Sequence, residues 1–167
     1  MIADVYHTIQ ATKPYVAFGV SPFGIWTTNT NVAEEEGIPL PSGISGGNMY
    51  QEIYCDPVAW LKEGTVDYLS PQLYWKIGGA QDYNKLCAWW TDLANRFGKQ
   101  FYSSMALYRY AENNSSNTGY YKNTDEFKNQ TLKNRSANYD NAPGNVFYNT
   151  LAWVYDCLLY TSDAADD

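Results

Sequence analysis

The stretch D-P-V-A-W-L-K-E-G-T-V-D-Y-L-S-P-Q-L-Y-W, residues 56–75, decides the predicted fold. Asp56 is a good helix N-cap, Pro57 fits the first helical turn, and Gly64 is a typical stop after the helix. The run that follows, residues 66–75, is too apolar for a strand with one wetted face. A helix that leads into such a strand is typical of α/β proteins, in which helices cover a parallel sheet.

The same alternation of helix and strand continues on both sides of this unit. Strands that alternate with helices imply right-handed βαβ units and a parallel sheet. Residues 23–54 are rich in Gly, Asn, Thr and Pro and are predicted to be a long connection, which is often functional in a compact domain. The further elements are helices at residues 3–11, between Gly79 and Gly98, and at residues 124–134 with Thr124 as the cap, and strands at residues 15–20, 100–107 and 145–148.

The composition describes one globular domain. The 167 residues are 45% hydrophobic and 17% charged, with a formal net charge of -7. A complete eight-fold βα barrel needs about 250 residues, so a whole barrel is excluded. The acidic balance argues against a nucleic-acid partner, because phosphates are bound by clustered Lys and Arg. No apolar run approaches the roughly 20 residues of a membrane-spanning helix, and the start of the chain carries no signal-peptide pattern.

Aromatic residues are the unusual feature of the composition. The chain has 6 Trp, 16 Tyr and 6 Phe, more rings than a core of this size needs. Tyr and Trp combine a flat apolar face with a polar edge, which suits sugars. Strand alternation points Gln72 and Tyr74 to one face. Rings stand beside hydroxyl, amide or guanidinium groups where predicted strands meet loops, the edge that carries the ligand in α/β folds, at residues 21–26, 70–75, 103–109 and 147–150.

The sequence offers few candidate catalytic or metal-binding residues. Asp56 is interpreted as a helix cap, Asp67 as the polar entrance to a strand, and residues 34–36 as a solvated run of Glu. His7, the only histidine, is interpreted as a surface residue. The residues alone therefore indicate a carbohydrate-binding α/β segment without a catalytic pair, and no metal or other cofactor is predicted. The cysteines are too widely spaced for a disulfide framework and are interpreted as buried free thiols at Cys55, Cys87 and Cys157.

Four motifs carry a resemblance to a known family. They are K-P-Y-V-A-F-G-V-S-P-F-G-I-W (residues 13–26), the stretch 56–75, A-W-W (residues 88–90) and P-G-N-V-F-Y-N-T (residues 143–150). They resemble the bacterial glycosyl-hydrolase-like family ten, over most of residues 1 to about 150. The resemblance implies an α/β fold that is a partial (β/α)8 TIM barrel, roughly strands five to eight with their helices.

The resemblance also implies how the chain is divided. Residues 1–156 are expected to be the C-terminal half of the barrel domain. The fourth strand of the family carries an aspartate-rich motif thought to supply the catalytic carboxylate. This sequence lacks that motif, so the N-terminal half of the barrel is expected to be missing. Residues 157–167, C-L-L-Y-T-S-D-A-A-D-D, look like the sequencing-adaptor read-through that ends open reading frames in metagenomic assemblies, and are interpreted as a non-native tail.

The implied activity is that of a glycoside hydrolase, which cuts O-glycosidic bonds of a bacterial envelope or other polysaccharide when the full barrel is present. The implied location is extracellular, periplasmic or in the cell envelope, with an export signal upstream of Met1. The implied partners are the glycan and the missing half of the barrel, and the isolated fragment is expected to be inactive. Two alternatives stay open: a non-catalytic carbohydrate-binding module, which predicts a closed β-rich fold, and a structural domain that uses its aromatic residues as a protein interface.

The resemblance assigns substrate-binding roles to residues in four places around the predicted pocket. It leaves the catalytic acid without a counterpart in this sequence. The assigned residues are Gln72 and Tyr74 facing the pocket, Trp75 at its rim, Ser21, Phe23 and Trp26 along one wall, and Tyr108 and Arg109 along another.

Overall fold

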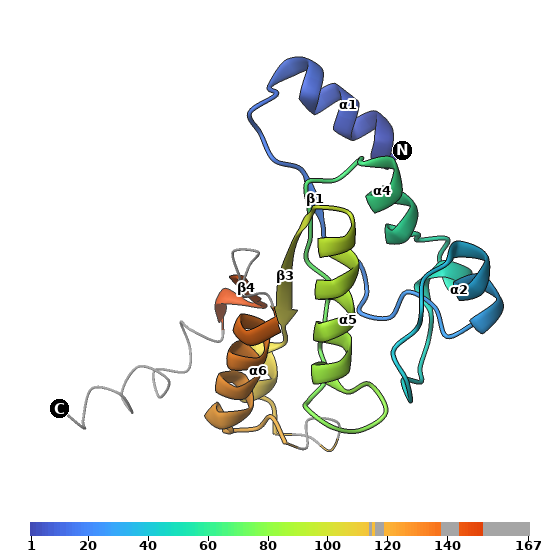
Figure 1. Cartoon of the computed structure of the whole chain (residues 1–167). Coiled ribbons are helices and arrows are strands. Elements are labelled where there is room, and N and C mark those ends of the chain that lie inside the picture. Colours follow the sequence, from blue (N-terminus) through green and yellow to red (C-terminus); the bar gives the residue numbers. More distant parts are fainter. Residues whose placement is uncertain (114, 116–118, 138–143, 152–167) are drawn as a thin grey trace.

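Helices and strands alternate along most of the chain in the computed structural model, which describes residues 1–113, 115, 119–137 and 144–151 (Figure 1). Cys157 and the interpreted tail, residues 157–167, lie outside the described residues. The elements are α1 (Ile2–Thr12), β1 (Gly19–Val20), α2 (Thr30–Glu36), α3 (Met49–Glu52), α4 (Pro57–Glu63), β2 (Tyr68–Leu69), α5 (Tyr83–Arg96), β3 (Gln100–Met105), the 3-10 helix η1 (Leu107–Tyr110), α6 (Thr124–Ala137) and β4 (Gly144–Phe147).

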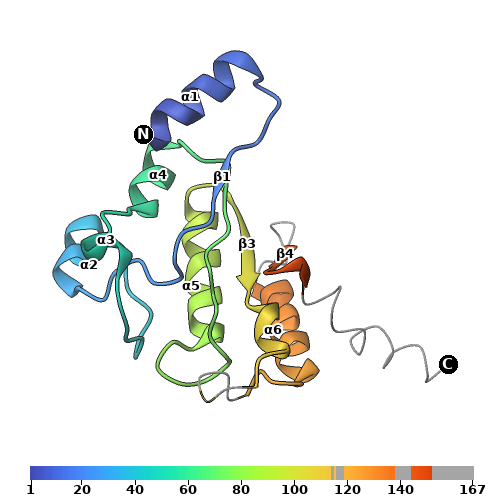
Figure 2. The same ribbon diagram turned by 180° about the vertical axis from the view of Figure 1, so that it is seen from behind.

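The strands form one parallel sheet in the order β1-β2-β3-β4. This confirms the predicted parallel α/β arrangement. Helices α5 and α6 lie side by side over one face of the sheet (Figures 1 and 2). Seen from behind in Figure 2, the strands carry no helix over their other face, in the part of the chain that the structure describes. On that open face the rings of Tyr68 and Tyr102 meet edge to face, with centroids 5.3 Å apart.

The predicted strand at residues 66–75 is shorter than expected, because β2 ends at Leu69. Pro71 has no N–H to donate and interrupts the ladder. The chain nevertheless keeps its course, since Gln72 forms parallel bridges with both Phe23 and Ser104. The sheet therefore extends beyond β2 towards its carboxyl edge, where Tyr74 and Trp75 follow.

The capping signals of the sequence are confirmed in α4. The Asp56 side chain accepts a hydrogen bond from the Ala59 backbone N–H, and Gly64 ends the helix with a φ of 69°. The cap predicted for α6 is wrong by one residue, because Asn123 Oδ1 accepts the Glu126 N–H and Thr124 is already helical. Either side chain type caps well, so sequence alone does not choose between neighbours.

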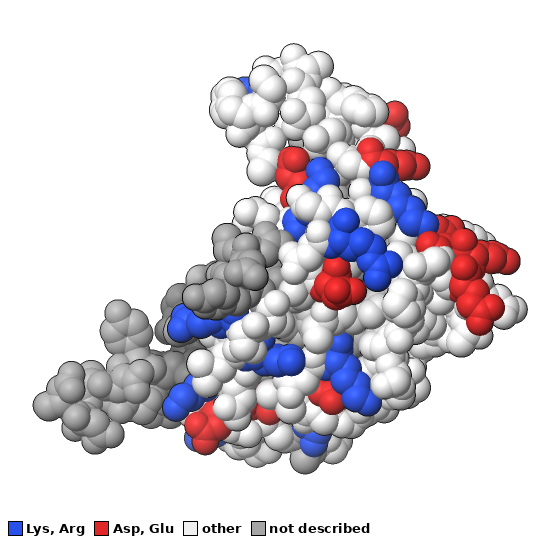
Figure 3. All heavy atoms as spheres, viewed as in Figure 1, with Lys and Arg blue, Asp and Glu red and all other residues white. Residues whose placement is uncertain are grey.

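The connection predicted for residues 23–54 is wrong in one respect, because it contains two short helices. Asn29 caps α2 and Asn48 caps α3, each through its side-chain oxygen. Gly37, with a φ of 65°, ends α2. Acidic side chains gather over α2 in Figure 3, and one of them, Glu36, pairs with Lys62 of α4. In the described ranges, no helix is both long and apolar enough to cross a membrane.

The core lies between α5 and the sheet. The helical spacing predicted for residues between Gly79 and Gly98 is confirmed, since α5 buries Leu86, Trp90 and Leu93 against the cluster that contains Phe101 of β3. Two buried amide side chains of α6 donate hydrogen bonds to backbone carbonyls, one in β4 and one in the segment after β2. Gln130 Nε2 donates to the Trp75 carbonyl at 3.2 Å, and Asn134 Nδ2 donates to the Gly144 carbonyl at 2.7 Å.

We expect the free energy of unfolding to fall as the pH rises above about 9. Burial raises the pKa of the Cys87 thiol to about 12, and burial also raises the pKa of the Tyr83 and Tyr120 phenols. The unfolded chain, with ordinary pKa values, releases these protons first, so alkali favours it. Urea unfolding followed by circular dichroism at about pH 8 and about pH 10.5 measures the loss. A midpoint that does not change over this range contradicts the prediction.

Of the two cysteines that the structure describes, only Cys87 is buried as predicted. Cys87 is buried and free, and Cys55 is half-buried and free. His7 lies on the exposed side of α1, in keeping with a surface residue.

Candidate functional site

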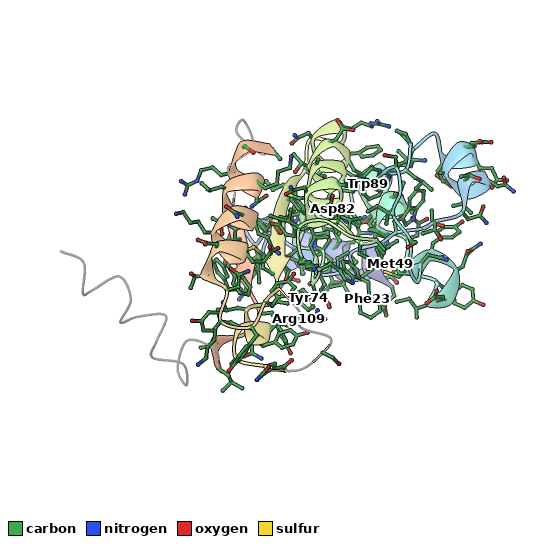
Figure 4. All side chains as sticks on the ribbon, turned by 90° about the horizontal axis from the view of Figure 1, so that it is seen from below. Phe23, Met49, Tyr74, Asp82, Trp89 and Arg109 are labelled. Atoms are coloured by element: carbon green, nitrogen blue, oxygen red, sulfur yellow. The ribbon has the colours of Figure 1, made fainter. Side chains whose placement is uncertain are left out.

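An aromatic groove lies at the carboxyl edge of the sheet, on the face opposite α5. Figure 4, which looks onto this edge, shows Phe23 and Tyr74 on one side of the molecule, and Trp89 and Asp82 of the α5 region on the other. The groove has a volume of about 280 Å³. Its lining combines rings, aliphatic side chains, two amides and a carboxylate, and it includes Phe23, Asn48, Met49, Glu52, Ile53, Gln72, Tyr74 and Trp75.

Three tyrosines form a cluster beside this groove, which we call the tyrosine cluster: Tyr74, Tyr108 and Tyr148. Tyr74 and Tyr148 stack with centroids 5.8 Å apart and an interplanar angle of 25°. Tyr108 stands edge-on to both, at 6.1 Å from Tyr74 and 6.0 Å from Tyr148. The backbone supports this arrangement, because the Tyr108 N–H donates to the Tyr148 carbonyl at 3.0 Å. The cluster therefore presents flat apolar ring faces with hydroxyl groups at their edges. Its Tyr148 side chain is 52% exposed and so is open to solvent.

The hydroxyl of Tyr74 contacts a side chain of strand β3. It lies 3.4 Å from Ser104 Oγ, and either atom can donate. Burial, followed by smaller effects of Tyr148 and Tyr108, raises the pKa of the Tyr74 phenol above its ordinary value, against a lowering by the Ser104 bond. The phenol therefore stays protonated at neutral pH and can donate a hydrogen bond to a ligand oxygen.

Gln72 and Trp75 are positioned by the backbone of the neighbouring segment. Gln72 Nε2 donates to the Ser21 carbonyl at 3.3 Å, which ties the amide to the β1 side of the groove. Trp75 packs over Gly24, where an added Cβ would lie 2.6 Å from the indole ring. Only glycine leaves space for Trp75 at the rim of the groove.

The structure brings most of the predicted site residues together. Phe23, Gln72, Tyr74 and Trp75 line the groove, and Phe23 is 56% exposed. Two others adjoin it through the tyrosine cluster, because Tyr108 belongs to the cluster and Arg109 Nε donates to its hydroxyl at 3.2 Å. Ser21 contributes its carbonyl to Gln72 rather than its side chain to the lining.

The structure does not bring Trp26 into this groove. Its side chain is 1% exposed and stacks on Trp89 of α5, with ring centroids 6.2 Å apart. The indole Nε1 donates to Asp56 Oδ1 at 3.1 Å. Trp26 faces a different cavity, of about 310 Å³, between residues 24–30, residues 40–44 and α5. The sequence places Trp26 in a motif with Phe23, but it does not show that the indole turns towards the helix α5.

Sequence reasoning passed over Glu52, the one carboxylate in the lining of the groove. Glu52 Oε1 accepts the Asn48 N–H at 3.0 Å, and a Cβ at position 47 would lie 3.0 Å from its other oxygen. The signal available was the helix start N-M-Y-Q-E, an amide cap followed by a carboxylate one turn later. Tyr148 falls within a predicted aromatic stretch, residues 147–150, but only the fold places its ring on Tyr74.

Two further acids, Asp56 and Asp67, serve the fold. Asp56 caps α4, and Asp67 Oδ2 accepts the Phe18 N–H at 2.7 Å near the amino end of β2. In the described ranges, no three side chains of His, Cys, Asp or Glu come together to hold a metal ion. In the part of the chain that the structure describes, the groove thus offers aromatic faces, the Tyr74 hydroxyl and two amides, the groups that bind a sugar, together with a single carboxylate.

Comparison with known proteins agrees with this geometry. The family model described as glycosyl hydrolase-like 10 matches residues 1–122. The chain is 37% identical over 113 residues to the glycosyl hydrolase DigH of Escherichia coli strain K12, covering 67% of this chain and 24% of that protein. It is 36% identical over 115 residues to the glycosyl hydrolase YngK of Bacillus subtilis strain 168, covering 68% of this chain and 21% of that protein.

The matched region therefore spans about a quarter of the length of these relatives. The family match includes α1 to η1, and with them Phe23, Gln72, Tyr74 and Arg109 of the groove and its surroundings. Because the family model covers well over half of the chain, the chain belongs to the glycosyl hydrolase-like 10 family.

Proposed function

We propose that this chain forms the C-terminal half of a (β/α)8 barrel, roughly strands five to eight, within a glycoside hydrolase. The parallel sheet with helices on one face supports this arrangement. The tyrosine-covered face of the sheet would then turn towards the interior of the barrel, where layers of side chains fill the space. The N-terminal half of the barrel is the partner that the proposal requires.

The observation that carries the proposal is the aromatic groove at the carboxyl edge of the sheet, flanked by the tyrosine cluster. In barrel enzymes this edge holds the substrate. The rings would stack on sugar faces, and the Tyr74 hydroxyl and the Gln72 amide would bond sugar hydroxyls. Binding and orientation of the glycan are thus the proposed tasks of this half.

Hydrolysis of an O-glycosidic bond needs two carboxyl groups, or one acid with help from the substrate. Among the described residues that line the groove, Glu52 is the carboxylate. We propose that the other half of the barrel supplies the remaining acid. The proposed substrate is a bacterial envelope or other polysaccharide, and the proposed location is extracellular, periplasmic or in the cell envelope.

The two alternatives receive less support. A non-catalytic carbohydrate-binding module was expected to have a closed β-rich fold, and that expectation is wrong, because the sheet is open, parallel and backed by helices. A protein-interaction domain would not need hydroxyl and amide groups held among the rings of one groove.

We expect the Tyr74→Ala variant to bind neutral oligosaccharides at least about tenfold more weakly than the parent chain, about 1.4 kcal/mol. The change removes the ring that stacks on Tyr148 and the hydroxyl that reaches Ser104. Isothermal titration with tetrasaccharides of cellulose, xylan and chitin measures it, after circular dichroism has shown that the chain is folded. Tyr74→Phe keeps the ring and is expected to lose less affinity for these oligosaccharides than Tyr74→Ala does.

The matched control is Tyr15→Ala, which removes a tyrosine that is 82% exposed and lies before β1. It should leave glycan affinity unchanged. The proposal fails if no oligosaccharide binds the folded chain or the full-length protein. It also fails if the gene, read upstream, encodes neither four further βα units nor an aspartate-rich strand.

A further inference from the structure

A second cavity, of about 200 Å³, adjoins the aromatic groove. Trp75 lines both of them. Two cations, Lys76 and Arg109, line the second cavity together with Gly78, Gly79 and Tyr120, and we call it the cationic pocket. Figure 4 shows Arg109 beside Tyr74, on the same side of the molecule as Phe23. A glycan in the groove would therefore pass within reach of two positive charges.

The guanidinium of Arg109 is held in place by rings. Its central carbon lies 5.6 Å from the centroid of Tyr120 and 5.8 Å from that of Tyr108. Its Nε donates to the Tyr108 hydroxyl at 3.2 Å. Among the described residues no acceptor takes a hydrogen bond from either Nη atom of Arg109. An ordered guanidinium with its two outer nitrogens open is arranged for a planar anion.

Neither cation is neutralised by an ion pair in the part of the chain that the structure describes, where the three ion pairs involve other residues. Two carboxylates contact the segment that lines the pocket, and one oxygen of each accepts a backbone N–H. Asp82 Oδ1 accepts the Gly78 N–H at 3.0 Å, and Glu126 Oε1 accepts the Ile77 N–H at 2.7 Å.

We propose that the cationic pocket binds the carboxylate of an acidic sugar within the glycan that occupies the aromatic groove. The inference rests on the proposed function and specifies the substrate class. A carboxylate can accept two parallel hydrogen bonds from the outer nitrogens of Arg109, while Lys76 adds a mobile point charge at the exposed side. The negative charges of Asp82 and Glu126 disfavour highly charged anions relative to a single carboxylate.

The test compares each acidic oligosaccharide with its own methyl ester, which has the same shape and no charge. The probes are tetrasaccharides of galacturonic acid and of hyaluronan, in which glucuronic acid alternates with N-acetylglucosamine. We expect the parent chain to bind at least one acid about tenfold more tightly than its ester in isothermal titration. The preference should shrink between about 50 mM and about 300 mM salt.

Two variants locate the effect. Arg109→Gln is expected to reduce the preference for the acid to about twofold or less, and Lys76→Gln to reduce it in part. No cation–π contact in the described residues joins Lys76 to the tyrosine cluster, so its effect is not expected to arise from displaced rings. Arg135→Gln makes the same charge change in the last turn of α6, and it should leave the preference intact.

The outcomes separate this inference from the proposed function. Equal affinity for every acid and its ester, with neutral tetrasaccharides still bound, overturns the cationic pocket and leaves the glycan groove standing. The cationic pocket is also overturned if Arg135→Gln lowers the preference as much as Arg109→Gln does. Failure of every oligosaccharide to bind contradicts the proposed function itself.

Discussion

Replacement of Trp90 by alanine is expected to lower the free energy of unfolding by about 4 kcal/mol, one of the two largest effects of a single change in this chain. The indole is 0% exposed at the centre of the cluster between α5 and the sheet. Its Nε1 donates to the Gly24 carbonyl at 2.9 Å, across 66 residues of sequence. The alanine variant therefore loses packing, opens a cavity and leaves a buried carbonyl without its donor.

Chemical denaturation followed by circular dichroism measures this loss. Trp90→Phe keeps most of the packing but not the N–H, and it is expected to cost about 2 kcal/mol. This milder variant stays informative if Trp90→Ala does not fold. A difference of less than about 1 kcal/mol between Trp90→Ala and the parent would show that the indole does not hold α5 to the groove segment.

The second large effect is expected from Gly24→Ala, which should destabilise the chain by about 3 kcal/mol and also weaken glycan binding. A Cβ at this position would lie 2.6 Å from the Gln72 carbonyl oxygen and 2.6 Å from the Trp75 ring. The backbone around the Gln72 carbonyl is fixed on both sides. The Gln72 N–H donates to the Pro22 carbonyl, and the Leu73 N–H donates to the Ser104 carbonyl. The clash therefore falls on the segment that shapes the groove.

Gly37→Ala is the matched control for this change. An added Cβ there meets no atom within 4 Å, and the cost comes only from a φ of 65°. We expect Gly37→Ala to lower the free energy of unfolding by about 1 kcal/mol and to leave the glycan affinity unchanged. If Gly24→Ala is no more destabilising than Gly37→Ala, then the close approach of Gly24 to Gln72 and Trp75 does not exist in solution.

The predictable parts of the fold are those specified within a few neighbouring residues. The Asp56 cap, the Gly64 stop and the apolar spacing of α5 were all predicted correctly, and so was the parallel sheet that follows from alternation. Strand length was overestimated at residues 66–75, because the cost of Pro71 depends on whether a neighbour needs its missing N–H. The short helices α2 and α3 were missed, since glycine and asparagine serve loops and helix ends equally.

The candidate site was predictable in its residue types but not in its partners. Gln72, Tyr74 and Phe23 were expected near one another and line one groove. Nothing local in the sequence indicates that Tyr148 stacks on Tyr74, or that Glu52 reaches the same groove. The ligand roles of these residues remain predictions that the binding experiments will decide.

By itself the sequence determined the class of the fold, both ends of α4, the edge of the sheet that carries the aromatic residues and the family. These properties follow from caps, spacing and motifs, which act over a few residues. Only the tertiary structure decided that Trp26 turns into the packing against α5 while Phe23, three residues earlier, stays 56% exposed. It also decided that Arg109 stands between two rings. Burial and ring contacts depend on segments far apart in the chain, which meet only when the parallel strands pair and α5 packs on them.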